Sequence, residues 1–86
     1  MNPTVTKTFW IVENVDKTAW VFYLDPKWGG SSISTTHTDS VWYATQAVNE
    51  TYNFLWQSHT LENARTKWKD IILCGGKVID TLYGKE

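Results

Sequence analysis

The sequence predicts an α+β domain in which a mainly antiparallel sheet of about four to five strands carries one C-terminal helix on one face. Two observations predict this class. Runs of β-branched and aromatic residues, separated by short polar breaks, occupy residues 8–56, and the one clear helical periodicity lies at residues 60–72. A series of strands followed by a helix and a last strand is typical of an antiparallel sheet with a helix packed across it.

The 86 residues form one domain, residues 1–86, because two separate cores would each be marginal in size. An apolar content of 42%, a charged content of 20% and a net charge of -1 are typical of a chain that folds in water. The longest apolar run, residues 19–24, is far shorter than the ~20 residues of a membrane-spanning helix. The N-terminus lacks the basic and apolar pattern of a secretory signal, so we expect a cytoplasmic protein with no membrane association.

The first two strands are predicted to form a hairpin. Residues 8–12 are all β-branched or aromatic, with apolar side chains at odd and even positions, which favours a strand buried on both faces. A polar break at residues 13–17 separates them from a second such run at residues 18–24. Side chains of the second strand alternate between two faces: one carries Trp20, Phe22 and Leu24, and the other carries Ala19, Val21 and Tyr23.

The middle of the chain is the ambiguous part. Residues 25–30 contain Pro26 and two glycines and predict a turn. Residues 31–40 are rich in Ser and Thr, which suits a solvated loop or an exposed edge strand, and we predict the loop. Residues 41–45 resume strand character, and residues 44–57 fit both helical and strand spacing; we predict strands, with a turn at residues 49–50.

A helix is predicted to begin near Thr60, whose hydroxyl can accept an N-terminal backbone hydrogen bond. Glu62 complements the positive end of the helix dipole, and the glycines at residues 75–76 end the helix. Residues 77–83 are predicted to form the last strand. The predicted core consists of Phe9, Ile11, Trp20, Phe22, Leu24, Val41, Leu61, Ala64, Trp68, Ile71 and Ile72.

No residue pattern points to catalysis, a metal site or a cofactor. His37 and His59 have no close ligand-spaced partner, and we expect both to be exposed loop residues. Cys74 is the one cysteine, which excludes a disulfide scaffold, and it lies at the C-terminal end of the helix, where the dipole opposes a thiolate. We predict a buried or half-buried, inert thiol there and a protein that is not an enzyme.

The aromatic content is the main functional signal, because six Trp, four Tyr and three Phe are more ring surface than so small a domain hides. With one helix on one sheet face, the other face is left for solvent or a partner. Interface centres favour aromatic side chains and disfavour charge. We therefore predict binding of a protein partner or a second copy of the chain. The predicted partner-binding residues are Trp10, Tyr23, Trp28, Trp42, Tyr43 and Trp56.

The alternative use of these rings is to stack on single-stranded nucleic acid, a sugar or a small aromatic ligand. Charge argues against nucleic acid. Residues 1–59 contain three Lys and five acidic residues, a net charge of -2, and residues 60–86 contain five basic and four acidic residues, a net charge of +1. Phosphate binding draws much of its affinity from Lys and Arg, and no concentrated basic face is visible.

The predicted helix also carries a family resemblance. Its Ala64-Arg65, Trp68, Ile72 and Gly75 resemble the terminal helix of small uncharacterised proteins of marine cyanobacteria and their phages. Those proteins pair a β-rich N-terminal part with an Ala-Arg-x-x-Trp helix that closes on Gly, although this chain has Gly76 where a second aromatic residue is expected. The resemblance covers about one fifth of the chain. It implies a small accessory protein, phage-encoded and acting on a host protein, and transfers no catalytic residue.

Overall fold

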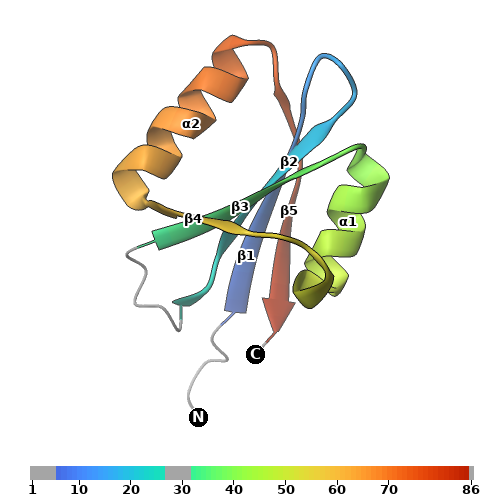
Figure 1. Cartoon of the computed structure of the whole chain (residues 1–86), viewed down its shortest axis with the longest axis vertical. Coiled ribbons are helices and arrows are strands. Elements are labelled where there is room, and N and C mark those ends of the chain that lie inside the picture. The colour runs from blue at the N-terminus through green and yellow to red at the C-terminus, as the bar shows by residue number, and fades with distance from the viewer. Residues whose placement is uncertain (1–5, 27–31, 86) are drawn as a thin grey trace.

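The computed structural model describes residues 6–26 and 32–85, which form an α+β structure with one antiparallel sheet (Figure 1). The sheet contains β1 (Thr6–Glu13), β2 (Ala19–Leu24), β3 (Ser32–Thr38), β4 (Gln57–Thr60) and β5 (Lys77–Lys85), in the order β4-β3-β2-β1-β5. The helices are α1 (Val41–Asn49), the short 3-10 helix η2 (Thr51–Asn53) and α2 (Leu61–Leu73). The predicted fold class is confirmed in its α+β character and its antiparallel sheet. The structure has two α-helices, α1 and α2, where we expected one.

The predicted hairpin of β1 and β2 is present. The two strands pair from Thr8 opposite Leu24 to Glu13 opposite Ala19. Their turn is closed by a hydrogen bond from the backbone N–H of Asn14 to the carbonyl of Thr18, at 2.8 Å. Because side chains alternate along a strand, the hairpin presents two apolar faces, as the sequence pattern predicts.

Residues 32–38 are a strand, so the predicted loop is wrong. β3 pairs with β2 on one side and with β4 on the other. Its buried hydroxyls have partners: Thr36 donates to the carbonyl of Leu55 at 2.8 Å, and Thr38 donates to the carbonyl of Ser40 at 2.8 Å. A Thr-rich strand can therefore lie inside the sheet, because β-branched side chains favour strands and each buried hydroxyl is satisfied.

Residues 41–49 are an α-helix and residues 51–53 a 3-10 helix, so the strands predicted for residues 41–57 are wrong; the next strand, β4, begins only at Gln57. Ser40 caps α1, its hydroxyl accepting a hydrogen bond from the backbone N–H of Tyr43. Ala44 and Ala47 are both fully buried against the sheet, and their small side chains allow close packing. The strand propensity of residues 41–43 was overridden by this cap and by the apolar face that follows it.

Each face of the sheet carries one α-helix (Figure 1). The face covered by α1 holds the core formed by Phe9, Ile11, Ala19, Val21, Tyr23, Ala44 and Ala47. The face under α2 carries the alternate side chains of the same strands, including Trp10, Trp20 and Phe22. The expectation that one sheet face has no helix is therefore wrong, because the unpredicted α1 covers it.

Helix α2 begins and ends where the sequence predicts. The Thr60 hydroxyl accepts a hydrogen bond from the backbone N–H of Asn63 at 3.1 Å. At the other end, Gly75 has a φ of 97°, a left-handed conformation that glycine adopts without strain. The last predicted strand is β5, which pairs with β1 and contains an irregularity opposite Ile11 and Val12.

The predicted core is confirmed in part. Phe9, Ile11, Phe22 and Ala64 are buried. Ile72, one turn after Trp68 near the end of α2, is exposed over 39% of its surface. The other predicted core residues are half-buried: Trp20, Leu24, Val41, Leu61, Trp68 and Ile71.

Within the described residues, no helix has both the length and the apolar character needed to span a membrane.

Candidate functional site

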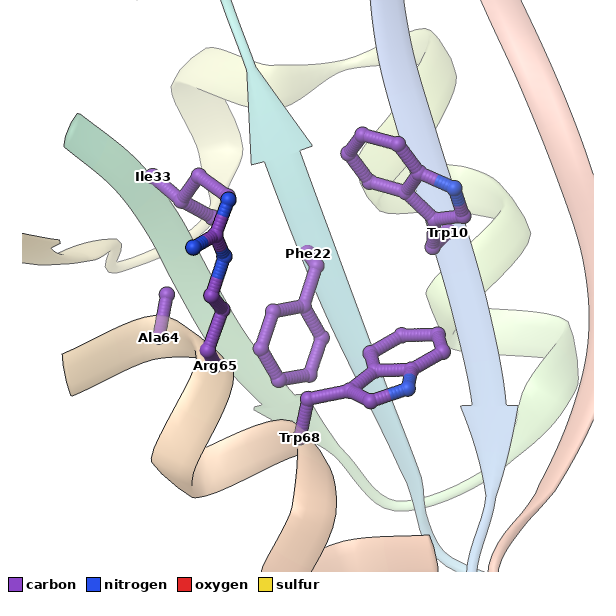
Figure 2. Close-up of a pocket in the computed structure, with 6 residues that line it drawn as sticks. All are labelled: Trp10, Phe22, Ile33, Ala64, Arg65 and Trp68. Carbon is purple, nitrogen blue, oxygen red and sulfur yellow. The ribbon is translucent and has the colours of Figure 1, made fainter. Parts of the chain in front are cut away.

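An apolar groove lies between α2 and its face of the sheet (Figure 2). Three strands and the helix contribute its walls, and the space is about 180 Å³. The lining side chains are Trp10, Phe22, Ile33, Ala64, Arg65 and Trp68. Five of these six are apolar, so the groove is a site for an apolar group rather than for a polar one.

The groove exists because Trp68 holds α2 over the sheet. Its indole meets the ring of Phe22 edge to face, with the ring centroids 5.1 Å apart and an angle of 80° between the planes. Figure 2 shows Trp10, on the neighbouring strand β1, beyond this pair. Ala64, one turn before Trp68, has too short a side chain to fill the space next to it. The half-buried indoles of Trp10 and Trp68 remain in part available to a ligand.

Arg65 supplies the one charge among the described residues of the groove lining. Its side chain is exposed and extends toward Ile33 in Figure 2. Among the described side chains, those of residues 7–26 and 32–81, none forms an ion pair or a hydrogen bond with its guanidinium. Arg65 can therefore offer all its N–H donors to an anionic group of a ligand that enters the groove.

The structure places one of the six predicted partner-binding residues, Trp10, in this groove. Tyr23 is buried on the other face, stacked on Phe9 with the ring centroids 4.5 Å apart. Its hydroxyl donates a hydrogen bond to the carboxylate of Asp25 at 2.9 Å. Tyr23 is thus a core residue, and its prediction as a contact residue is wrong because α1 covers its side of the sheet.

Trp56 is half-buried and belongs to the same packed face as Tyr23. The two rings meet edge to face, with their centroids 5.3 Å apart, and the Trp56 indole N–H donates to the carbonyl of Thr51 at 2.8 Å. An indole that packs against the core and whose N–H is already hydrogen-bonded stabilises the fold and has little surface left to contact a partner.

Trp42 and Tyr43 are exposed on the first turn of α1, at 63% and 48% of their surface. Their rings contact each other edge to face at 4.9 Å, but they are not part of the groove. Trp28, the remaining predicted contact residue, lies outside the described residues. The five predicted residues that the structure describes therefore do not form one surface.

Sequence reasoning missed five of the groove residues: Phe22, Ile33, Ala64, Arg65 and Trp68. Part of the signal was available, because Ala64 and Arg65 lie four and three positions before Trp68, and residues at these spacings are neighbours on a helix surface. The sequence predicts Trp68 as a core residue alone. In the structure its indole packs on Phe22 and also lines the groove. The contribution of Ile33 could not be seen while residues 31–40 were predicted to be a loop.

A second ring cluster lies on the other side of α2, where Lys67 places its ammonium 3.8 Å from the centroid of the Trp20 ring. The exposed ring of His37 meets the same indole edge to face at 4.8 Å, from strand β3 rather than from the predicted loop. The Trp20 indole therefore contacts both Lys67 and His37 within the chain. This arrangement stabilises α2 on the sheet through a cation–π contact.

The other side chains that could bind a metal or act in catalysis lie far apart in the fold. His59 is half-buried on β4, and its Nε2 lies 3.0 Å from the hydroxyl of Thr35. Cys74 is exposed, which corrects the predicted burial and follows from its place at the open end of α2. No group of three or more His, Cys, Asp or Glu able to hold a metal ion occurs in the part of the chain that the structure describes.

Among the described residues, a carboxyl in the β1–β2 turn, that of Asp16, has a lowered pKa. Hydrogen bonds from the hydroxyl and then from the backbone N–H of Thr18 lower the pKa of the Asp16 carboxyl, and His37 adds a smaller lowering effect. Such bonds favour the ionised form of the carboxyl. The shift is explained by turn structure and does not mark a reactive group.

No family model matches the chain, and no curated protein or solved structure is significantly similar to it.

Proposed function

We propose that this protein is a small non-enzymatic interaction module, an inhibitor or adaptor, that binds a protein partner by accepting an apolar side chain of that partner in the groove. The observation that carries the proposal is the groove itself, an open space of about 180 Å³ with two partly exposed indoles in its lining. Aromatic side chains in pockets of this kind are the usual anchors of protein interfaces.

The size and chemistry of the groove favour one side chain as occupant. A cavity of about 150 Å³ lined by apolar side chains is large enough for benzene. The groove therefore suits a phenyl or leucyl group, whose burial contributes roughly 1.5–3 kcal/mol. That contribution is enough for a recognisable anchor, while the rest of the affinity would come from contacts around it.

A nucleobase suits the groove less well. Each base carries several hydrogen-bonding groups, and a buried polar group without a partner costs about 1–3 kcal/mol. Among the described lining side chains, Arg65 and the indole N–H groups of Trp10 and Trp68 are those that can hydrogen-bond. Single-strand binding proteins also follow the phosphate backbone with a positively charged groove, whereas here one Arg stands among apolar side chains.

The non-enzymatic part of the proposal rests on the same lining. Its described side chains include no carboxylate, imidazole, hydroxyl or thiol that could act as nucleophile, acid or base. The described His and Cys side chains do not line the groove.

The proposal is tested with ¹⁵N-labelled protein titrated with N-acetyl-phenylalaninamide, using N-acetyl-serinamide as the matched probe. We expect the Phe probe alone to shift the indole N–H resonances of Trp10 and Trp68. Filling the groove with Ile33→Trp should abolish these shifts, and Ile79→Trp, a change at an exposed position on β5, should not. Identical responses to the two probes would contradict the proposal.

The occupant could also be a second copy of the chain. Size-exclusion chromatography with light scattering separates this form from binding of a different protein. A dimer that Ile33→Trp dissociates, and Ile79→Trp does not, would identify the groove as a self-association site.

A further inference from the structure

We propose that the segment bound by the groove is an acidic peptide, in which a Phe or Leu side chain enters the groove and neighbouring Asp or Glu carboxylates pair with the basic rim of α2. The inference rests on the proposed function and adds the charge of the partner to it. By the α2 rim we mean Arg65, Trp68, Lys69, Ile72 and Leu73.

The first argument is the arrangement of charge along the rim. Arg65 and Lys69 are four residues apart on α2, so both side chains project from the same side of the helix, one turn apart. Like charges at this spacing destabilise an isolated helix. No ion pair with a described side chain offsets this repulsion. An anion held between the two cations would remove it.

The second argument is that apolar and basic surfaces are continuous here. A shallow hollow next to the groove is lined by Trp68, Lys69, Ile72 and Leu73, so Trp68 belongs to both. Leu73 is exposed over 84% of its surface and Ile72 over 39%. Among the residues that the structure describes, no acidic side chain lines either the groove or the hollow. The whole surface is therefore complementary to a segment that alternates apolar and acidic side chains.

The third argument concerns the anion. A guanidinium binds a carboxylate or a phosphate equally well by charge, often through two parallel hydrogen bonds. A nucleic acid, however, would bring its phosphates with bases that lack partners in this groove. Phe and Leu side chains carry no polar atoms to satisfy. The combination of one apolar group and nearby carboxylates is that of an acidic peptide.

The test is an NMR titration of the ¹⁵N-labelled protein with four probes. The first is a pentapeptide with capped ends and the sequence Glu-Glu-Phe-Glu-Glu, and the second replaces its Glu residues by Lys. The third is Glu-Glu-Ser-Glu-Glu, and the fourth is an eight-residue oligothymidylate. The readout is the dissociation constant from the indole N–H resonances of Trp10 and Trp68.

We expect the acidic Phe peptide to bind at least ten-fold more tightly than the basic one, which corresponds to about 1.4 kcal/mol. Arg65→Gln should weaken binding of the acidic Phe peptide by roughly three- to ten-fold, as expected for a charge-assisted pair at a partly exposed site. Lys77→Gln removes the same charge at an exposed position on β5 and should change binding by less than about two-fold. Both substitutions are at exposed positions, so neither removes a core contact.

Equal binding of the two Phe peptides, unaffected by Arg65→Gln, would overturn this inference and leave the proposed function intact. If neither Phe peptide shifts the two indole resonances, the proposed function fails as well. A response to oligothymidylate alone would overturn both in favour of nucleic-acid binding.

Discussion

The indole of Trp68 on α2 meets the phenyl ring of Phe22 on β2 edge to face, with their centroids 5.1 Å apart. This contact gives Trp68 two roles, because the same indole holds the helix on the sheet and lines the groove. Removing the Trp68 side chain would therefore change both the stability of the protein and the shape of the groove, so it cannot separate the two roles. They can be separated by filling the groove from the opposite wall, at Ile33.

Replacing Trp68 by Ala should destabilise the protein by about 2–4 kcal/mol. Truncating a fully buried Trp to Ala costs about 3–5 kcal/mol. The expected loss is smaller here because Trp68 is only half-buried. The measurement is the free energy of unfolding from urea denaturation. Trp42→Ala is the matched control, since Trp42 is exposed over 63% of its surface, and it should cost less than about 1 kcal/mol. Equal losses from the two variants would show that Trp68 does not support α2.

Replacing Tyr23 by Phe should cost about 1–3 kcal/mol, although it removes a single oxygen. The Tyr23 hydroxyl donates to Asp25, and both residues are only 5% exposed. Losing a hydrogen bond to a buried charged group costs more than an average hydrogen bond contributes. Urea denaturation again provides the measurement, with Tyr43→Phe on the exposed turn of α1 as the control. A neutral Tyr23→Phe would show that Asp25 is satisfied without this hydroxyl.

Replacing Gly75 by Ala should destabilise the protein by about 1–2 kcal/mol, because Gly75 has a φ of 97°. An added Cβ would also lie 2.7 Å from Cγ2 of Val15, in the β1–β2 turn. Val15 is exposed and can move, so backbone strain should be the larger part of the cost. A double-mutant cycle with Val15→Ala measures the clash. A cost that disappears in the Val15→Ala background would assign the whole effect to the clash.

The elements that the sequence predicts correctly are those with local signals. The hairpin is marked by two β-branched and aromatic runs with a polar break between them, and α2 is marked by the Thr60 cap and the glycine stop. Each signal acts within a few residues and needs no knowledge of distant contacts.

The elements that were mispredicted depend on distant partners. The hydroxyl-rich β3 is stable inside the sheet because Thr36 bonds Leu55, nineteen residues away. Helix α1 carries strand-forming residues at its start and is decided by the burial of Ala44 and Ala47 against strands earlier in the chain. Composition correctly signals unusual aromatic surface. Composition cannot show that α1 covers Tyr23 or that α2 and Ile33 enclose a groove. The first depends on the mispredicted helix α1, and the second depends on the mispredicted strand β3, which carries Ile33.

The β1–β2 turn should make a small pH-dependent contribution to stability through Asp16. Hydrogen bonds from Thr18, first through its hydroxyl and then through its backbone N–H, lower the pKa of the Asp16 carboxyl in the folded state. Ionised Asp16 therefore stabilises the fold at pH values above its unfolded pKa of about 3.9. This contribution is lost as the pH falls through the lower, folded-state pKa. Stability should thus decline at acid pH, and Asp16→Asn should reduce the slope of that decline.

The direct measurement is an NMR titration of the Asp16 side-chain carboxyl in the native protein and in Thr18→Val. The native midpoint should lie below that of an unstructured Asp. Thr18→Val retains the β-branched shape and the backbone N–H but removes the hydroxyl, which is the largest cause of the lowered pKa. Its midpoint should move back toward the ordinary value without reaching it, since the backbone bond at 3.1 Å remains. An unchanged midpoint in Thr18→Val would assign the shift to the backbone N–H and to His37 instead.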